Sequence, residues 1–539
     1  MDIKNTLQQA IGLHQNGHLI EAERLYASIL AHQPDHADAL HLYGLIEFAR
    51  GDLDQAVDLI RRAIDSAAEQ AVFHFNLGNV LRELDALEAA AAAYAEAIRL
   101  QPEEADYYNN LGEVCQAQGH WAEAREYYSR AVALHPDDAE LQFNLGNACH
   151  ALQQAQTALT HYQTAIRLQP EVAEFHRALA TAHMSLDQPQ AALAHYQQAA
   201  ALAPEEAGYQ LDTGACLQRL GRLEDAIRCY QQALALHPGM AQACNNLGSI
   251  YHAREDLNTA AHYYQAALAS DPSLAEAHKN LAHILDATAQ RAQALYHYRE
   301  ALRLQPDDAE VAYKLAALQG DAAPDTAPPE YVARLFDQYA DNFDSHLTEV
   351  LGYRTPQLLR ELFDSLQPAA TALQILDLGC GTGLSGQAFH DCAARMIGID
   401  LSPRMIDKAA ARGIYTELNV GDVLAELDRD SRHWDLILAA DVFVYLGDLS
   451  EIFARAATAL HPGGWLLFSV EVAAPEVERF VLHEAGRYAH SRAYLQQLAA
   501  ATGLQVLAEQ TTVLRQNLGQ DVSGCLYALQ AGSVLAPQK

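Results

Sequence analysis

Long hydrophobic runs, a surplus of cationic side chains and paired cysteines are all missing from this sequence. Lys and Arg together number 35 among 539 residues, against 69 Asp and Glu, so the formal net charge is −34. Binding to nucleic acid or to an anionic membrane surface depends on clustered Lys and Arg, so we expect neither. No stretch of about 18 apolar residues occurs, and the N-terminal stretch lacks the apolar core of a signal peptide. We therefore expect neither membrane insertion nor secretion.

The eight cysteines include no C-x-x-C pair, which argues against a structural metal site or a disulfide framework. No other cluster of metal ligands is apparent, so no metal is expected. Buried thiols in a reducing cytoplasm fit these cysteines, and a cytoplasmic location is the expectation. Hydrophobic residues make up 50% of the chain, which supplies a sizeable core and excludes global disorder.

The first three-fifths of the chain repeats with a period of 34 residues. Prolines, small residues and aromatic residues each recur at this interval. The proline series misses one member at Ala68, and Ile60 stands in the gap of the aromatic series. The columns are Pro34, Pro102, Pro136, Pro170, Pro204, Pro238, Pro272 and Pro306; Gly44, Gly78, Gly112, Gly146, Ala180, Gly214, Gly248 and Ala282; and Tyr26, Tyr94, Tyr128, Tyr162, Tyr196, Tyr230, Tyr264 and Tyr298.

Each unit contains two runs with helical apolar spacing, and a proline follows the second run, where it blocks continuation of the helix. The small residues let two antiparallel helices approach, and the aromatic ring is expected to fill the gap against the next unit. The pattern resembles the tetratricopeptide repeat over about residues 3–308. Because one helix pair cannot bury its apolar face alone, we expect about nine pairs to stack into an all-α solenoid over 1–319, closed by a capping helix at 309–319.

A column of asparagines recurs within this array, one residue before the Leu of the Leu-Gly pair. Asn is a weak helix former, so helix propensity does not explain the column. In solenoids of this kind the column lines the concave face and binds an extended peptide backbone; the alternative is that it bridges neighbouring helices. We predict a protein or peptide partner on the concave face, contacted by Asn76, Asn110, Asn144, Asn246 and Asn280.

The last two-fifths of the chain has a different pattern. Residues 320–330 are rich in Pro and Ala and have no period, which indicates a linker. Short apolar runs then alternate with helical segments, as in a mostly parallel sheet covered by helices. Residues 504–530 predict a hairpin that adds an antiparallel edge. The expected parallel strands are 374–378, 395–400, 415–420, 435–440 and 465–471.

A glycine-rich loop follows the first expected strand, where residues 375–383 read ILDLGCGTG. Its glycines let the backbone approach a ligand closely, and Asp400, which ends the second expected strand, can accept both hydroxyls of a ribose. Residues 381–386 also match the G-x-G-x-x-G pattern of dinucleotide sites. However, Asp377 would repel a pyrophosphate, and no basic residue between 374 and 394 compensates. A phosphate-free cofactor with a cationic amino acid and a sulfonium, such as S-adenosyl-L-methionine, is favoured.

Five segments in order resemble the motifs of class I S-adenosylmethionine-dependent methyltransferases. They are the glycine loop, Asp400, residues 421–423 (GDV), residues 435–445 (DLILAADVFVY) and residues 461–465 (HPGGW). With the repeats, the chain resembles bacterial tetratricopeptide-containing methyltransferases. This implies a multidomain protein, with the solenoid at 1–319, a linker at 320–330, and a Rossmann-like α/β methyltransferase domain at 331–539 built on a seven-stranded, mostly parallel sheet.

The resemblance also implies roles for individual residues. Asp441 follows the fourth strand, where substrate-facing groups lie, although it could instead cap a helix. His490 could serve as a base, although a lone histidine is more often structural. Phe343 could close over the cofactor or simply pack. The predicted cofactor-binding residues are Asp377, Gly379, Cys380, Gly381, Gly383, Asp400, Asp422 and Val423, and the predicted catalytic residues are Asp441 and His490.

The sequence thus predicts a methyltransferase that uses S-adenosyl-L-methionine and whose solenoid recruits a protein partner or substrate. Two alternatives stay open. One is an interaction scaffold with a cofactor-sensing or inactive domain; the other is a methyltransferase for a small metabolite, localised by its repeats. The methyl acceptor is not specified. An amine or hydroxyl acceptor would need a base to remove its proton, whereas a carboxylate or thiolate would not.

Overall fold

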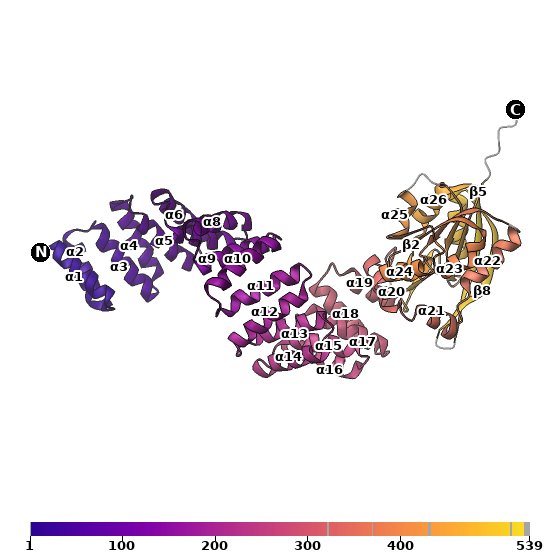
Figure 1. Ribbon diagram of the computed structural model, residues 1–539, viewed down its shortest axis with the longest axis horizontal. Helices are drawn as coiled ribbons and strands as arrows, with labels where there is room; N and C mark the ends of the chain where they lie inside the picture. Colours follow the sequence, from indigo (N-terminus) through magenta and orange to yellow (C-terminus); the bar gives the residue numbers. More distant parts are fainter. Residues whose placement is uncertain (1, 321–322, 369, 430–432, 518–519, 533–539) are drawn as a thin grey trace, which may run out of the picture. The chain divides into compact units, whose positions relative to one another are not determined.

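A computed structural model describes the chain except for residues 1, 321–322, 369, 430–432, 518–519 and 533–539. It contains two compact units, Met1–Ser270 and Asp271–Lys539, whose elements are labelled in Figure 1. Among the described residues, no helix combines the length and hydropathy needed to cross a membrane.

The first unit is a series of antiparallel helix pairs (Figure 1). The first helices of the pairs are α1 (Ile3–Gln15), α3 (Ala37–Arg50), α5 (Ala71–Glu83), α7 (Ala105–Ala117), α9 (Ala139–Ala151), α11 (Ala173–Ser185), α13 (Ala207–Arg219) and α15 (Ala241–Ala253). The second helices are α2 (Leu19–His32), α4 (Leu53–Ser66), α6 (Leu87–Leu100), α8 (Trp121–Leu134), α10 (Ala155–Leu168), α12 (Pro189–Leu202), α14 (Leu223–Leu236) and α16 (Leu257–Ser270).

The small and aromatic columns meet inside each pair. A Cβ atom placed on Gly112 of α7 would lie 2.7 Å from the ring of Tyr128 in α8, and one on Gly146 would lie 2.5 Å from the ring of Tyr162. Both rings are buried. The ring therefore fills the gap over the glycine of its own pair, which corrects our expectation that it packs against the next unit. Glycine is required here because a larger residue would push the two helices apart.

The second unit begins with the last helix pair, α17 (Ala275–Ala287) and α18 (Arg291–Leu304), and with α19 (Ala309–Gln319), which coincides with the predicted capping helix. An α/β domain follows. Its strands are β1 (Leu373–Leu378), β2 (Ala393–Asp400), β3 (Glu417–Val420), β4 (Trp434–Ala439), β5 (Leu460–Val472), β6 (Phe480–His483), β7 (Arg487–His490), β8 (Leu504–Asn517) and β9 (Gln520–Ala531).

These strands form one mixed sheet in the order β3-β2-β1-β4-β5-β7-β6, with β9 paired to β5 and β8 paired to β9. Neighbours from β3 to β5 run parallel, and β8 and β9 form the predicted antiparallel hairpin. The sheet has nine strands in the described residues, whereas seven were expected. The additional strands, β6 and β7, are four residues each, too short to give a clear alternating pattern.

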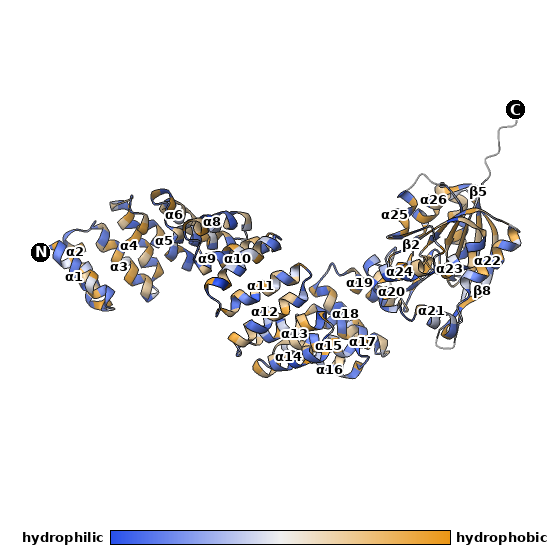
Figure 2. Ribbon diagram, viewed as in Figure 1, coloured by the Kyte–Doolittle hydropathy of each residue, from blue (hydrophilic) through white to orange (hydrophobic). Residues whose placement is uncertain are grey.

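Helices cover both faces of the sheet. On one face α25, α26 and α27 pack against strand residues such as Ile437 and Phe468, and on the other α22 and α23 pack against Leu436 and Leu467. In Figure 2, where orange marks hydrophobic residues, much of the ribbon of the strands between these helices is orange. The helices of the domain are α20 (Pro329–Tyr339), α21 (Phe343–Ser345), η1 (His346–Val350), α22 (Thr355–Leu366), α23 (Leu384–Phe389), η2 (His390–Cys392), α24 (Pro403–Ala411), α25 (Val423–Arg429), η3 (Phe443–Tyr445), α26 (Ser450–Ala459) and α27 (Arg492–Thr502).

Residues 323–328, within the predicted linker, have no helix and lie along the domain. The carbonyl oxygen of Asp325 accepts hydrogen bonds from the backbone N–H groups of Gly447 (2.8 Å) and Asp448 (2.9 Å). The N–H of Ala327 donates to the carbonyl of Tyr445 at 2.9 Å. This part of the segment is therefore held by the loop after β4, while the domain boundaries at 319, 330 and 331 stay a prediction.

Helix α19, which we predict to cap the repeat array, packs against the β6–β7 hairpin. The buried hydroxyl of Tyr313 donates to the carbonyl of Gly486 at 2.8 Å, and Tyr313 shares an apolar cluster with Val332, Leu482 and Tyr488. A turn residue of the hairpin is thereby bonded to a helix of the repeat array.

Candidate functional site

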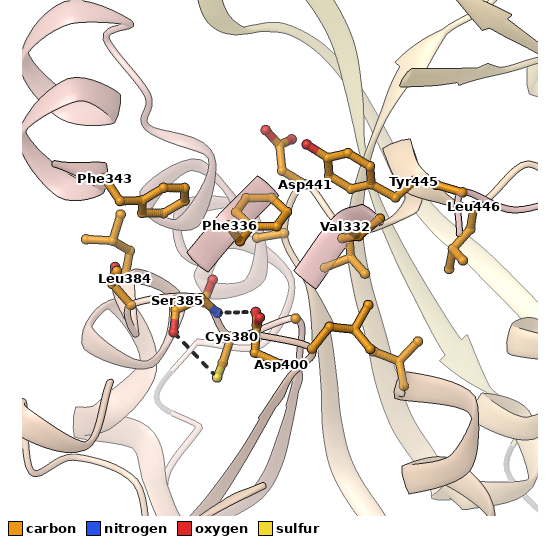
Figure 3. A pocket seen from close by; sticks show the side chains of 18 of the residues that line it. Val332, Phe336, Phe343, Cys380, Leu384, Ser385, Asp400, Asp441, Tyr445 and Leu446 are labelled. Carbon is orange, nitrogen blue, oxygen red and sulfur yellow. Dashed lines mark hydrogen bonds between the residues drawn. The ribbon is translucent and has the colours of Figure 1, made fainter. Parts of the chain in front are cut away.

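A pocket opens at the carboxyl ends of the parallel strands, the edge where open α/β sheets bind their ligands. Three of the four acids predicted for this site line the pocket. They are Asp400 at the end of β2, Asp422 after β3 and Asp441 after β4. Figure 3 shows Asp400 and Asp441 facing this pocket from different strands. The fourth acid, Asp377 in β1, is not part of the lining.

The glycine loop forms the floor of the pocket. Gly379 (φ +61°) and Gly381 (φ +54°) adopt the left-handed conformation that glycine tolerates, and both line the pocket with Cys380. A Cβ on Gly379 would lie 2.6 Å from Cγ2 of Val442, so the loop could not pack there with any side chain. Gly383 (φ +93°) caps α23 and lies outside the lining.

The thiol of Cys380 is buried, and burial, followed by the charges of nearby acids, raises its pKa well above the usual range. The Cys380 thiol therefore stays neutral and forms part of the pocket wall. It is not suited to be a nucleophile, because nucleophilic cysteines need a lowered pKa.

Asp400 is fixed by the loop that it faces. One carboxylate oxygen accepts the N–H of Gly381 at 2.9 Å, drawn as a dashed line in Figure 3, and the other accepts the N–H of Ser402 at 2.9 Å. Each oxygen keeps a second lone pair, so the carboxylate can still accept hydrogen bonds from a ligand. Burial raises the pKa of Asp400, which these backbone bonds partly offset.

Asp377 lies beneath the loop and supports it. The hydroxyl of Tyr415 donates to its Oδ2 atom at 2.6 Å and accepts the N–H of Gly386 at 3.2 Å, which ties β1 to α23. Its Oδ1 atom is buried and has no hydrogen-bond partner in the described chain. Burial raises the pKa of Asp377 to about 7. Such an orphaned carboxylate oxygen is suited to a cationic group.

Asp422 and Val423 both line the pocket at the start of α25. One oxygen of Asp422 accepts the N–H groups of Leu424 (2.8 Å) and Ala425 (3.2 Å), so this residue also serves as the cap of the helix. Its placement is compatible with the predicted cofactor-binding role, and the two backbone contacts give it a capping role as well.

Asp441 belongs to a buried ion network that sequence reasoning missed. It has a left-handed backbone (φ +58°), which is costly for a residue other than glycine and is common at functional sites. Its carboxylate accepts the hydroxyl of Ser469 at 3.1 Å and pairs with Arg515 at 3.1 Å. Arg515 also contacts Glu471, and Glu471 lies 3.7 Å from Arg487. Both arginines line the pocket. Their positions, on β8 and β7, lie outside the five motifs. Arg487 stands three residues before the predicted His490, but no residue pattern singled it out.

His490 lies outside the pocket lining. The imidazole is fully buried, and its Nε2 atom lies 2.9 Å from the carbonyl oxygen of Leu446 and 3.1 Å from that of Gly447, so Nε2 carries the proton and donates. Burial lowers its pKa to about 4. The structure does not bring this histidine to the site, and its contacts are those of a structural residue joining β7 to the loop after β4.

Aromatic side chains form the apolar wall of the pocket. Phe336 of α20 lies edge-on to Phe343 (5.9 Å between ring centroids) and to Tyr445 (5.5 Å), and all three line the pocket. Figure 3 shows Phe336 and Phe343 near Leu384 of the loop helix. Helix α20 precedes the sheet in sequence, so this wall depends on the segment before the first motif.

The asparagine column connects successive repeats. The Nδ2 atom of Asn110 donates to Asn79 at 2.9 Å, and that of Asn144 donates to Asn109 at 3.0 Å, each across about one period of sequence. Asn76 lies 2.8 Å from Nε2 of His41, Asn246 is hydrogen-bonded to Tyr230, and Asn280 also has a partner. These contacts are those expected of residues that bridge neighbouring helices, and each of the five residues is half-buried and keeps some exposure.

Comparison with known proteins identifies both parts of the chain. Residues 344–509 match a family model described as a methyltransferase domain. Models of the tetratricopeptide repeat match residues 7–71, 78–119, 103–171, 151–207, 177–227 and 211–275.

The chain carries tetratricopeptide repeats and a methyltransferase domain.

Similar curated proteins are O-methyltransferases. The ubiquinone biosynthesis O-methyltransferase of Coxiella burnetii (strain RSA 493 / Nine Mile phase I) is 29% identical over 98 residues, which are 18% of this chain and 42% of that protein. The malonyl-[acyl-carrier protein] O-methyltransferase of Serratia marcescens is 26% identical over 151 residues, 28% of this chain and 55% of that protein. The chain thus spans about two-fifths to just over half of the length of the curated relatives it matches.

Solved structures that resemble the chain are repeat proteins. MamA is 23% identical, with a TM-score of 0.29, over 30% of this chain and 95% of that one. YrrB, described as a TPR protein with an unusual peptide-binding site, is 22% identical, with a TM-score of 0.32, over 36% of this chain and 97% of that one.

The methyltransferase domain carries groups that fit S-adenosylmethionine. The lining offers the bare backbone of the loop and the buried carboxylate of Asp400, and the unpartnered Oδ1 atom of Asp377 lies beneath the loop. The cation that contacts the loop, Arg412, is paired with Asp344 and lies outside the lining. Among the described residues, no cluster of His, Cys, Asp and Glu could hold a metal ion.

Proposed function

We propose that this chain transfers a methyl group from S-adenosyl-L-methionine bound in the pocket of its methyltransferase domain. The observation that carries the proposal is the pairing of Asp400 with the N–H of Gly381, because it places a buried carboxylate against the glycine loop. The lining includes two cations, Arg487 and Arg515, and both lie on strands β7 and β8 rather than on the loop. Arg412 contacts the carbonyl of Thr382 in the loop, but it lies outside the lining and is paired with Asp344. A pyrophosphate at the loop would therefore have no free counter-charge in the lining, which supports the sulfonium cofactor over a dinucleotide.

When bound, the donor supplies an electrophilic methyl group on a positively charged sulfur. The chain's own residues then have two tasks: to orient the reactants in line and to exclude water. Asp400 and Asp422 would hold the nucleoside end by hydrogen bonds, and the glycine loop would let it approach the backbone. Phe336 and Phe343 would close the apolar wall over the reacting centre.

Calorimetry with the full chain tests this function. S-adenosylmethionine and S-adenosylhomocysteine should both bind, and NAD should not. Asp400→Asn should weaken both by roughly ten- to a hundredfold, the scale of hydrogen bonds to a charged group. Asp407→Asn is the matched control, because Asp407 is an exposed acid on neighbouring helix α24. Binding of NAD without S-adenosylhomocysteine, or equal affinity in the Asp400 variant, would contradict the proposal.

We further propose that the repeats recruit a protein partner or substrate. This second proposal is supported by the repeat architecture and by the half-buried asparagines, each of which offers both a hydrogen-bond donor and an acceptor. Because these asparagines also bond between repeats, their removal affects stability as well as capture. A pull-down should therefore compare the Asn110→Ala/Asn144→Ala variant with wild type at matched helicity by circular dichroism. Recovery of the same proteins at the same yield would refute the role of the column in recruitment.

A further inference from the structure

Arg487 is the cation in the pocket whose pairing is least complete. Its guanidinium lies 3.7 Å from Glu471, which is longer than a hydrogen bond. Glu471 is already engaged by Arg515, which also holds Asp441. Arg487 further stacks over the ring of Tyr445, with 5.7 Å between its guanidinium carbon and the ring centroid. Its side chain is about one-quarter exposed, at 28%, and lines the pocket, so its donors face the space that a ligand would fill.

Arg515 differs from Arg487 in both burial and pairing. Its side chain is 7% exposed, and its two terminal nitrogens each meet a different carboxylate, Asp441 and Glu471. Asp441 and Glu471 carry two negative charges, and Arg515 and Arg487 together balance them. Arg515 uses both terminal nitrogens on these acids, whereas Arg487 lies beyond hydrogen-bond distance of Glu471 and keeps its donors open. An arginine with open donors presents a planar fork that matches a carboxylate.

Apart from Asp400 and Asp422, which we assign to the donor, the described lining of the pocket offers few groups that could take a proton from an acceptor. It includes no histidine and no lysine. The carboxylate of Asp441 is already engaged by Arg515 and by the hydroxyl of Ser469. Burial raises the pKa values of Tyr353 and Tyr445, so both hydroxyls stay neutral. An alcohol or amine acceptor would have to lose a proton here without a base, whereas a carboxylate is already ionised.

We propose that the methyl acceptor is a carboxylic acid whose carboxylate is bound by Arg487, and that the product is its methyl ester. This rests on the proposed function, since it names the substrate class of that same pocket. A carboxylate oxygen forms the new bond to the methyl carbon while the carbon–sulfur bond of the donor breaks, and the electron pair of that bond remains on sulfur. The carboxylate and the sulfonium neutralise each other, so no proton is released and no base is required. The apolar walls around Phe336, Phe343 and Tyr445 suit a hydrophobic remainder of the acid.

The test uses the full chain, a methyl-labelled donor and a panel of simple probes. The panel contains hexanoic, decanoic, phenylacetic and cinnamic acids, each beside its matched primary alcohol and primary amine. Label should pass to at least one acid, and mild alkali should release it as methanol, because esters are alkali-labile whereas methyl ethers and methylamines are stable. Label on an alcohol or amine, or no labelled acid from a chain that binds the donor, overturns the proposal.

Arg487→Met separates binding of the acceptor from binding of the donor. We expect KM for the accepted acid to rise about ten- to a hundredfold, with the calorimetric Kd for S-adenosylhomocysteine changed less than about twofold. Arg429→Met is the matched control, since Arg429 is an exposed arginine outside the lining. An unchanged KM overturns the role of Arg487, and an equal loss of donor affinity shows that the arginine holds the donor's own carboxylate instead. Failure of the wild-type chain to bind the donor would refute the proposed function itself, and calorimetry identifies that case before any acid is tested.

Discussion

Replacing Asp377 by asparagine should change how the stability of the methyltransferase domain depends on pH. Asp377 is 1% exposed, one of its oxygens has no partner in the described chain, and burial raises its pKa to about 7. Asparagine keeps an oxygen that can accept the hydroxyl of Tyr415, while its amide cannot ionise. The substitution therefore removes a titrating group and little of the packing.

The direction of the pH dependence of stability follows from whether Asp377 binds its proton more tightly in the folded or in the unfolded chain. With a pKa of about 7 in the folded state and 3.8 as the ordinary value, the folded chain holds a proton that the unfolded chain has already lost. The domain therefore loses stability as pH rises from about 4 to about 7 and no further above that. Each pKa unit corresponds to about 1.4 kcal/mol, so the whole penalty is on the order of 4 kcal/mol, of which about 2 kcal/mol falls between pH ~5.5 and pH ~8.

Urea unfolding followed by tryptophan fluorescence measures this, because Trp434 and Trp465 are both buried in the domain. Wild type should lose about 2 kcal/mol more than Asp377→Asn between the two pH values. Asp407→Asn, which alters an exposed acid, should follow wild type. Parallel curves for wild type and Asp377→Asn would refute the reasoning. If the proposed donor places a cation near Asp377, its affinity should also rise with pH in wild type and stay flat in the variant.

Two further substitutions test the packing of the repeats and of their cap. Gly112→Ala would place a methyl 2.7 Å from the ring of Tyr128 and should lower the free energy of unfolding by about 1–3 kcal/mol. Gly12→Ala meets nothing within 4 Å and should raise it by up to about 1 kcal/mol, because Ala favours the helix more than Gly does. Urea unfolding followed by circular dichroism distinguishes the two outcomes. Tyr313→Phe leaves the carbonyl of Gly486 without its buried donor and should speed hydrogen exchange in the β6–β7 hairpin, while unchanged exchange would show that the bond is dispensable.

The periodic features of the fold could be predicted because they are local and repeated. The 34-residue interval places Gly146 and Tyr162 in one helix pair independently of the rest of the chain. The helix predicted at 309–319 likewise has the observed bounds. The five parallel strands and the terminal hairpin were likewise visible as apolar runs. The β6–β7 hairpin was not visible, because strands of four residues take their identity from pairing with each other and with β5.

The candidate site likewise contains residues that the sequence could predict and residues that it could not. Gly379, Gly381 and Asp400 lie next to one another because each ends or follows a parallel strand, so a sequence motif suffices to place them. Arg487 on β7 and Arg515 on β8 reach the pocket from strands beyond β5, and no local pattern marks them. His490 was predicted as a base because of its residue type. In the structure its Nε2–H group instead donates hydrogen bonds to the carbonyl oxygens of Leu446 and Gly447. Residue type alone could not show that.

The contact between α19 and the hairpin bears on how the two parts of the chain work together. Tyr313 bonds to the carbonyl of Gly486, and the next residue is Arg487, which faces the pocket. Arg291 of α18 also pairs with Glu484 of the same hairpin. The last repeat therefore supports the strand from which the proposed acceptor-binding arginine projects. A cut after Gly320 would remove that support while leaving in place the glycine loop, Asp400 and the lining residues Thr326, Ala327 and Pro329. We therefore expect a fragment that begins there to keep its affinity for the donor and to lose affinity for the acceptor, a separation that a linker without contacts would not produce.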